Sequence, residues 1–332
     1  MILTVTPNPS IDRTVTLNSP LTRGAVHRVA SVSSEPGGKG VNVARVLTLA
    51  QIEAVALLPA PAGDPLLAAL ESIAVPFRSV PVTEPVRTNV AITEPDGTTT
   101  KLNERGATLD HAAVEALTRA VVELAQYATW VVLSGSLPPG LPDRWYADVV
   151  ALLAPLDCRV AVDTSDAPLA ALAASFDRAA PDLIKPNAEE LASITSAVSA
   201  EELESAVALG DPEPVIAAAR ELTARGARSV LATLGAAGGV LVDQTGSWLA
   251  TPPPIVPRST VGAGDSSLAG YVRADVAGAD APARLQMAVA YGSAAAALPG
   301  SSLPSPAHLH VDGVSVTPHP CPQTMQLKVP HA

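Results

Sequence analysis

Short runs of β-branched and apolar residues alternate along the chain with longer amphipathic stretches. ILTVT at 2–6 is typical of a strand. After the glycines of 37–40, apolar residues recur at Val43, Val46, Leu47 and Ala50, which is the spacing of an amphipathic helix. Residues 112–127 repeat that spacing. We therefore predict a strand followed by a helix at the start of the chain and a further helix over 112–127.

Four more apolar runs each end in polar residues or glycine. They are WVVLSG (130–135), RVAVD (159–163), DLIKPN (182–187) and SVLAT (229–233). Strands that alternate with helices predict a mostly parallel, doubly wound α/β sheet flanked by helices. Ligands bind beyond the carboxyl ends of the strands in such sheets. We therefore expect the chemistry at the polar ends of these runs.

Two stretches depart from this alternation. Residues 12–35 and 86–103 alternate apolar and polar positions and contain turn signals, PDG among them, as hairpins do. They predict a small β-sheet lid beside the main sheet. The Pro-rich segment 318–332 has no periodicity and predicts a poorly ordered tail, which leaves 1–317 as a single domain.

Composition narrows the possible partners. Hydrophobic residues make up 48% and charged residues 16%, against the usual ~25% charged, so a large apolar core is available. The net charge of −11 repels a polyphosphate, and we expect no nucleic-acid partner. There is no apolar run long enough to cross a membrane. The two cysteines are too few for a disulfide framework, which favours the cytoplasm.

The segment TVGAGDSSLAGYVRADV (260–276) contains the most specific candidate site. Gly262, Ala263 and Gly264 precede Asp265 and a stretch with helical spacing. Small residues at a helix N-terminus let backbone amides approach an anion, which the helix dipole also favours. Asp265 in the first turn is then placed to accept a proton during phosphoryl transfer. The alternative is a carboxylate that only caps the helix.

A second glycine-rich segment, PGGKGVN (36–42), also leads into a helix. Lys39 and Asn42 are placed to face a polyol or a phosphate. The segment matches neither GxGxxG nor the Walker A pattern. Its alternative is a glycine-rich turn with a solvated lysine.

Two later segments also join a strand to polar or glycine-rich positions. In LIKPNAEEL (183–191) a strand ends at Lys185, and carboxylates follow at a helix start. They either complement the helix dipole or hold Mg²⁺ through water. ATLGAAGGVLV (232–242) predicts a strand, a turn and a strand, with amides over 233–238 that either meet nucleotide phosphates or form a plain hairpin.

These four segments, in this order and together with TPNPSIDRT (6–14), SGSLPPG (134–140) and DTS (163–165), resemble the ribokinase-like (PfkB-type) carbohydrate kinases. The likeness extends over about 2–317 and is strongest to the phosphofructokinase and tagatose 6-phosphate kinase branch. It implies a doubly wound fold with a β lid through which two copies associate as a homodimer. It also implies ATP as co-substrate and Mg²⁺ as cofactor.

The resemblance also implies roles for single residues. Asp265 matches the catalytic base, and the amides of Gly262, Ala263 and Gly264 match its anion hole. Sugar hydroxyls are matched by Asp12, Gly38 and Asn42, with Lys39 nearby. The phosphates and Mg²⁺ are matched by Lys185, Asn187 and Glu190, where Glu190 acts on the metal indirectly. The ATP-binding turn is matched by Thr233, Gly235 and Gly238.

The acceptor expected from the resemblance is a sugar phosphate. Arg87 matches a phosphate-binding position, Lys101 is a second candidate and Arg28 a third, while Ser134 and Ser136 follow the same branch. A guanidinium suits a phosphate better than a neutral sugar. The two ends of the chain most resemble kinases that act on fructose 1-phosphate. Fructose 6-phosphate and tagatose 6-phosphate are alternatives, and a non-catalytic sugar-phosphate or nucleotide-binding protein is an alternative of another class.

Overall fold

The computed structural model describes residues 1–197 and 199–319. Its main element is a ten-stranded sheet. In spatial order the strands are β14 (Ser315–His319), β13 (Gly246–Thr251), β12 (Gly239–Asp243), β11 (Ser229–Thr233), β10 (Leu183–Ile184), β9 (Arg159–Asp163), β8 (Trp130–Ser134), β1 (Ile2–Val5), β4 (Ala54–Pro59) and β5 (Phe77–Val80). Neighbours from β5 to β11 are parallel, and β12, β13 and β14 are added antiparallel. The predicted mostly parallel α/β sheet is confirmed.

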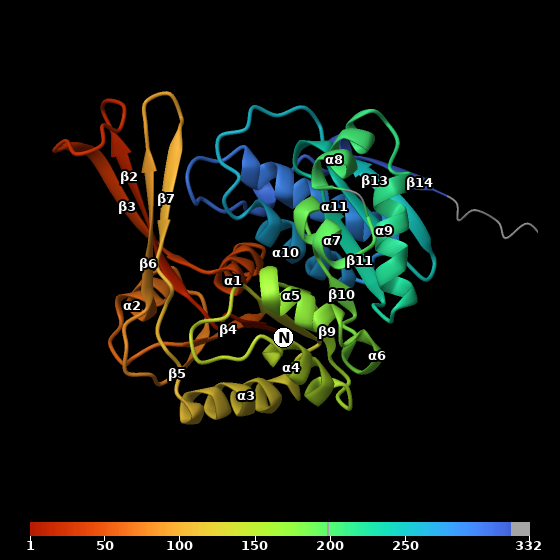
Figure 1. Cartoon of the computed structure of the whole chain (residues 1–332), viewed down its shortest axis with the longest axis horizontal. Coiled ribbons are helices and arrows are strands. Elements are labelled where there is room, and N and C mark those ends of the chain that lie inside the picture. The colour runs from red at the N-terminus through yellow and green to blue at the C-terminus, as the bar shows by residue number, and fades with distance from the viewer. Residues whose placement is uncertain (198, 320–332) are drawn as a thin grey trace, which may run out of the picture.

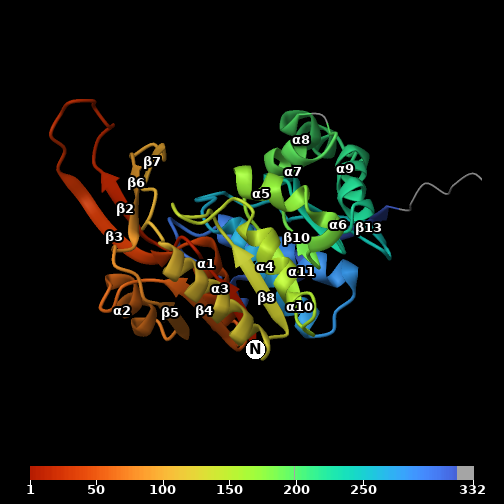
Figure 2. The same cartoon turned by 60° about the horizontal axis from the view of Figure 1, so that its bottom comes forward.

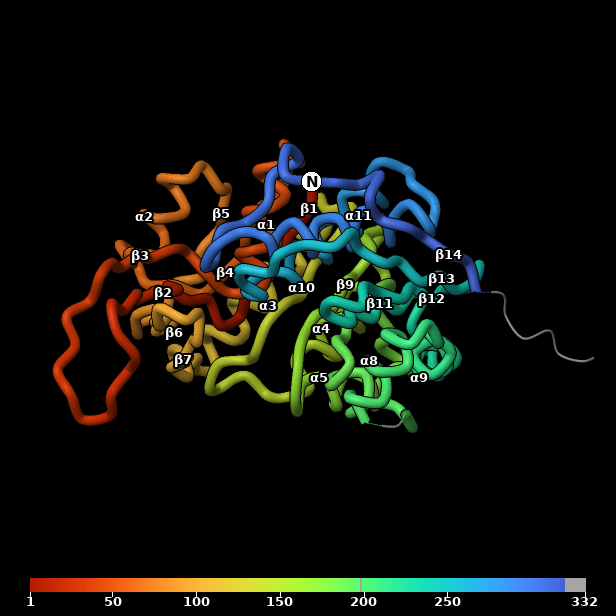
Figure 3. The backbone as a smooth tube through the Cα atoms, turned by 90° about the horizontal axis from the view of Figure 1, so that it is seen from above, coloured from red at the N-terminus to blue at the C-terminus, as the bar shows by residue number. Residues whose placement is uncertain are grey.

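Helices cover both faces of this sheet (Figure 3). One face packs against α1 (Lys39–Leu49), α10 (Ala263–Val276) and α11 (Ala281–Ala296). The other packs against α3 (His111–Ala125), α4 (Trp145–Leu153), α5 (Asp166–Ala173), α6 (Phe176–Ala179), α7 (Ala188–Ile194), α8 (Ala200–Ala208) and α9 (Glu213–Ala224). In Figure 2, α3 and α4 lie across β4 and β8.

Strand β8 shows how the sequence produces these layers. Successive strand side chains point to opposite faces. Trp130 and Val132 join the cluster under α1, α10 and α11, whereas Val131 and Leu133 join the cluster under α3 and α4. A strand buried on both faces needs a continuous apolar run, which is why WVVL carries no polar residue before Ser134.

A second, four-stranded sheet stands beside the main sheet (Figure 1). Its order is β3 (Val29–Gly37), β2 (Ser10–Leu17), β6 (Arg87–Thr93) and β7 (Thr99–Asn103). The helix α2 (Pro65–Ser72) packs next to its base. This confirms the strands predicted within 12–35 and 86–103, apart from the exposed segment 18–28, which lies outside the strands.

The strand predicted to end at the polar residues of 182–187 is confirmed as Leu183–Ile184, and Asn187 adds an isolated parallel bridge to Thr233. One predicted boundary needs correction. The tail predicted from 318 begins too early. Pro318 and His319 extend β14 along β13, since an edge strand tolerates a proline. The rest of that predicted tail, 320–332, lies outside the described residues. Short 3₁₀ turns complete the fold: η1 (Gly235–Ala237), η2 (Pro306–His308) and η3 (Val311–Gly313).

Candidate active site

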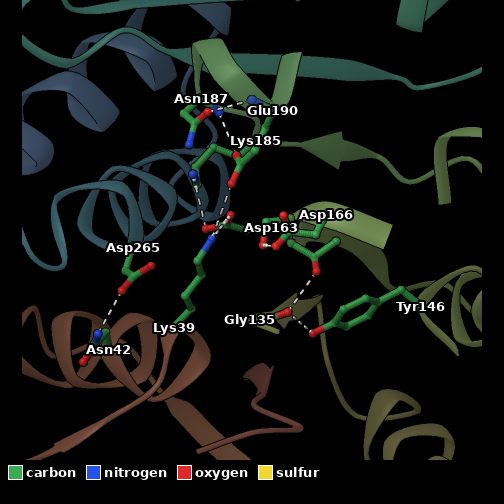
Figure 4. Close-up of polar contacts among 12 residues, drawn as sticks. Lys39, Asn42, Gly135, Tyr146, Asp163, Asp166, Lys185, Asn187, Glu190 and Asp265 are labelled. Carbon is green, nitrogen blue, oxygen red and sulfur yellow. Dashed lines mark hydrogen bonds and ion pairs between the residues drawn. The ribbon is translucent and has the colours of Figure 1, made fainter. Parts of the chain in front are cut away.

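The carboxyl ends of the central strands meet the N-termini of α1 and α10. Asp163 ends β9 and Lys185 follows β10, while Lys39 begins α1 and Asp265 lies in the first turn of α10. Figure 4 shows these side chains pointing toward one another. Polar residues predicted from separate motifs therefore lie together at the edge of the sheet where ligands are expected.

Asp265 is held at the N-terminus of α10. The preceding Gly262 has a φ of 74°, a left-handed conformation that glycine adopts without strain. The Asp265 side chain is 7% exposed, and its Oδ2 accepts a hydrogen bond of 2.8 Å from the Asn42 Nδ2. First-turn amides have no partner within their own helix. The turn therefore presents amide donors beside one buried carboxylate.

Asp163 links two lysines. Its Oδ1 lies 2.9 Å from the Lys39 Nζ, and its Oδ2 lies 3.2 Å from the Lys185 Nζ. The Asp163 and Lys185 side chains are 1% and 4% exposed. The Lys185 Nζ would be 3.3 Å from a Cβ built on Gly264, so this ammonium group lies next to the N-terminus of α10. Two positive charges and the helix dipole therefore converge on one place.

The surroundings displace the pKa values of the two buried aspartates in opposite directions. Burial, and next the negative charge of Asp163, raise the pKa of Asp265 to about 6. Burial also acts to raise the pKa of Asp163, but Lys185 and Lys39 outweigh it and hold that pKa below its ordinary value. The ionised form of Asp163 is therefore favoured, and the raised pKa of Asp265, about 6, suits a general base.

Lys39 and Glu190 complete this charged cluster. Burial acts to lower the pKa of Lys39, but Asp163, Asp265 and Glu190 together raise it above its ordinary value. The Glu190 Oε1 lies 4.0 Å from the Lys39 Nζ. Burial raises the pKa of Glu190. Lys39 therefore stays charged and neighbours three carboxylates.

Asn187 and Glu190 form a capping box at the start of α7. The Glu190 amide donates to the Asn187 Oδ1 at 2.8 Å, and the Asn187 amide donates to the Glu190 Oε2 at 2.9 Å. This satisfies two helix-end amides. One Glu190 oxygen is thereby occupied, while Oε1 faces Lys39. The cap fixes the carboxylate at the edge of the charged cluster.

The predicted strand, turn and strand over 232–242 is confirmed. Asn187 and Thr233 form an isolated parallel bridge, which joins the turn to the α7 cap. Gly238 has a φ of 100°, and a Cβ there would collide with the Ala250 carbonyl. Gly235 has a φ of 54° with open space around it. Gly238 is therefore required by the fold, and Gly235 leaves room beside the turn.

The residues predicted to bind sugar hydroxyls lie at the base of the small sheet. The Asp12 Oδ1 accepts from the Ser10 Oγ at 2.8 Å and from the Asn89 Nδ2 at 3.0 Å. Gly38 has a φ of 103°, and a Cβ there would meet Thr6. The chain therefore passes close to Thr6 on its way into α1.

The two predicted serines are placed differently. The Ser136 Oγ accepts from the Asn8 Nδ2 at 3.2 Å and lines a pocket of about 470 Å³. Ser134 is fully buried. We therefore retain Ser136 and not Ser134 in the site that we propose for the sugar.

Arg87 lines the same pocket, and the other basic candidates do not. Its Nη1 and Nη2 donate to the carbonyls of Glu104 and Asn8 at 3.0 and 3.1 Å. Lys101 is exposed on β7, and Arg28 is exposed just before β3. Neither of these two belongs to the pocket lining. The structure therefore brings one of the three predicted cations to this pocket.

Sequence reasoning gave no role to several residues of the site. Asp163 was named only within the DTS motif, although a carboxylate at the end of an apolar strand is an available signal. Arg105 and Asn8 line the pocket with Arg87, and nothing in the local sequence marks them. Asp166 lines it too and has a φ of 55°.

Within residues 1–197 and 199–319, no three His, Cys, Asp or Glu side chains are grouped to hold a metal ion. No described helix has the length and apolar character to cross a membrane.

The sequence is similar to known proteins over most of its length. A family profile described as pfkB family carbohydrate kinase matches residues 5–308. The 1-phosphofructokinase of Rhodobacter capsulatus is 36% identical over 323 residues, which cover 95% of this chain and 96% of the relative. That of Xanthomonas campestris pv. campestris is 36% identical over 275 residues, 82% of this chain and 83% of the relative.

Solved structures of phosphofructokinase-2 have a similar fold. Escherichia coli phosphofructokinase-2 in complex with substrates and products has a TM-score of 0.81 at 29% identity, covering 92% of this chain and 96% of that one. Its tetrameric inhibited form has a TM-score of 0.79 at 29% identity, with 90% and 95% covered.

Proposed function

The chain belongs to the pfkB family of carbohydrate kinases, and on that premise we propose that it transfers the γ-phosphoryl group of ATP to fructose 1-phosphate. The products are fructose 1,6-bisphosphate and ADP. The observation that carries this proposal is the buried Asp265 carboxylate beside the first-turn amides of α10 and the Lys185 ammonium. Curated relatives named 1-phosphofructokinase support the acceptor.

In the proposed reaction, Asp265 accepts the proton of the acceptor hydroxyl as that oxygen attacks the γ-phosphorus. The bond from phosphorus to the bridging oxygen of ADP breaks at the same time. The amides of Gly262, Ala263 and Gly264 stabilise the charge on the transferred group, and Lys185 adds a positive charge next to them. Such preorganised donors supply much of the catalysis in phosphoryl transfer.

Lys39 and Asp163 have supporting roles in this proposal. Asp163 fixes both lysines in place through its two oxygens. Its negative charge also raises the pKa of Asp265, which strengthens the base. Lys39 lies between this carboxylate and Glu190, where it can meet a phosphate oxygen.

Mg²⁺ is the cofactor that these residues fit. Mg²⁺ usually keeps several waters and takes one or two carboxylates beside substrate phosphates. Glu190, fixed by its capping box with Asn187, offers one such carboxylate. Bound Mg²⁺ would neutralise charge on the phosphates of ATP. The turn with Thr233, Gly235 and Gly238 would lie along those phosphates.

Acceptors with a 6-phosphate form the second candidate. Phosphofructokinase-2 from Escherichia coli, solved with fructose-6-phosphate, has a TM-score of 0.79 and 28% identity. Tagatose 6-phosphate belongs to the same class. The higher identity of 36% to 1-phosphofructokinases favours fructose 1-phosphate.

An acceptor panel tests the proposed function. The purified chain is given MgATP with fructose 1-phosphate, fructose 6-phosphate, tagatose 6-phosphate, fructose or ribose, and kcat/KM is compared. We expect the highest value for fructose 1-phosphate and loss of turnover when a chelator removes Mg²⁺. A higher kcat/KM for another acceptor would identify that acceptor as the substrate in place of fructose 1-phosphate. Absence of turnover with all five would favour a non-catalytic binding protein.

The small sheet has a face suited to a second copy of this chain. Asp12, Asn89 and Arg87 share the face toward the pocket by strand register, and the opposite face carries Val15, Val32, Val90, Ile92 and Leu102. Leu102 is 56% exposed and Val32 is 44% exposed. We infer a homodimer through this face. Leu102→Glu should then yield monomers by analytical ultracentrifugation, and a monomeric unaltered chain would contradict it.

The cytoplasmic location and the single domain over 1–317 stay predictions.

A further inference from the structure

A second arginine lies in the pocket that contains Arg87. Arg105 belongs to the segment between β7 and α3, and its side chain lines the same pocket of about 470 Å³. Its backbone is fixed, since the Arg105 carbonyl accepts from the Asn8 Nδ2 at 3.0 Å. Gly106 follows with a φ of 96°, and a Cβ there would collide with Asn8. The backbone of Arg105 is therefore held in place against Asn8.

Arg87 and Arg105 are joined through the same backbone. Arg87 donates to the carbonyl of Glu104, next to Arg105, and to that of Asn8. Among its remaining donors, the buried Nε has no hydrogen-bond partner. Other arginines form ion pairs, but among the described residues no carboxylate lies within 4.0 Å of either guanidinium. Two guanidinium groups without an ion pair within 4.0 Å therefore line the pocket, and the charges of Asp12 and Glu104 act on Arg87 from farther away.

Two carboxylates line the same pocket. Asp143 lies in the segment between β8 and α4, and Asp166 begins α5. A dianionic phosphate is repelled by these carboxylates and attracted to the two arginines. The charges of the lining residues therefore favour a bound phosphate beside the arginines.

We propose that Arg105 binds, together with Arg87, the phosphate that the acceptor already carries, and that it thereby sets the preference for phosphorylated over free sugars. This rests on the proposed function, in which the acceptor is a hexose phosphate. Two planar guanidinium groups can donate to more phosphate oxygens than the bidentate pair of bonds that one arginine forms. Lys101, which the sequence suggested for this role, lies by strand register on the same face of the small sheet as Arg87 and Asn89, but it is exposed and does not line the pocket.

The test compares Arg105→Ala and Arg105→Lys with Arg78→Ala. Arg78 is exposed on the edge strand β5, so its removal makes the same change in net charge elsewhere. KM is measured for MgATP, for the best hexose phosphate of the acceptor panel and for the matching free sugar. Melting temperatures report on folding.

We expect Arg105→Ala to raise KM for the hexose phosphate by about tenfold or more, since hydrogen bonds to charged groups contribute about 1.5–3 kcal/mol. KM for MgATP and turnover of the free sugar should match the unaltered chain, and Arg105→Lys should restore part of the loss. Asp166→Asn should lower KM for the hexose phosphate, because asparagine keeps the left-handed backbone and removes a repelling charge.

The outcomes separate the two proposals. If the unaltered chain phosphorylates a hexose phosphate and Arg105→Ala has the same KM for it, the role of Arg105 is wrong and the proposed function stands. An equal rise in KM for the free sugar would also overturn this role. If the unaltered chain phosphorylates only free sugars, or none of the panel, the proposed function fails and the role of Arg105 fails with it.

Discussion

Asn42 and Asp265 are 223 residues apart in the sequence, and the Asn42 Nδ2 donates a hydrogen bond of 2.8 Å to the Asp265 Oδ2. One residue lies in the first helix of the chain, and the other begins α10. The bond joins the two glycine-rich segments into one site. It also favours the ionised form of Asp265 and so opposes the effects of burial and of Asp163 on its pKa.

A pH dependence follows from this balance. Asp265 accepts a proton only when it is ionised, and its pKa is raised to about 6. The value of kcat/KM should therefore fall as the pH is lowered through about 6. Asn42→Leu removes the bond that lowers this pKa, so the acidic limb should move to higher pH. A limb that stays in place or moves to lower pH would contradict the assignment of Asp265.

Asp163→Asn should strongly destabilise the fold. It leaves Lys39 and Lys185 without the buried carboxylate between them, and breaking a buried ion pair costs about 3–5 kcal/mol. Urea unfolding at pH 7 measures the loss. The pKa of Asp163 is lowered in the folded chain, so this stabilisation is present above the unfolded pKa of about 3.9 and is lost as the pH falls further.

The control for this comparison is Asp148→Asn. Asp148 pairs with Arg144 on the surface of α4, where a salt bridge contributes about 0–1 kcal/mol. Similar losses for the two variants at pH 7 would show that Asp163 does not hold the lysines as described.

The N-terminus of α10 offers a test that separates activity from stability. Gly264→Ala places a Cβ 3.3 Å from the Lys185 Nζ, which displaces that ammonium group. We expect kcat to fall by about 10²-fold, near the effect of losing one oxyanion donor. Stability should hold or rise, since alanine is the better helix former.

Gly278, just beyond the C-terminal end of α10, provides a control in which stability should change and kcat should not. It has a φ of 80° and open space around it, so Gly278→Ala should cost about 1 kcal/mol in strain and leave kcat unchanged. Equal kcat values for Gly264→Ala and the unaltered chain would remove Lys185 from the phosphoryl site.

Arg87→Ala should raise KM for the hexose phosphate far more than KM for MgATP. The guanidinium lines the pocket at the base of the small sheet, away from the turn assigned to the nucleotide. Steady-state kinetics with each substrate varied in turn provide the measurement. Equal increases in both KM values would argue against a phosphate contact.

Much of this fold could be predicted from the sequence because local patterns govern it. The apolar spacing after Gly40 specifies α1, and a glycine-rich turn between two apolar runs specifies the β11–β12 hairpin. The strand β14 was missed, because its pairing depends on the free edge of β13 rather than on its own residues. A proline normally disfavours a strand, and Pro318 is tolerated in β14 because this strand lies at the edge of the sheet.

The residues of the site likewise divide into those that local motifs indicate and those that only the tertiary structure brings together. Asp265, Lys39 and Asn42 belong to glycine-rich motifs, so the sequence identified them. Asp163 is the last residue of a strand, as many aspartates are, and only the tertiary structure shows the two lysines on its oxygens. Arg105 is a single cation in a loop, and its place beside Arg87 results from bonds to Asn8, almost one hundred residues earlier.

The most direct measurement is the turnover number of Asp265→Asn with MgATP and the preferred hexose phosphate, alongside the affinity for ATP. Asparagine keeps the shape of the side chain and can still accept from Asn42, but it cannot take up the proton. The account predicts that kcat falls by at least about 10²-fold while ATP binds as before. A kcat close to that of the unaltered chain would contradict it.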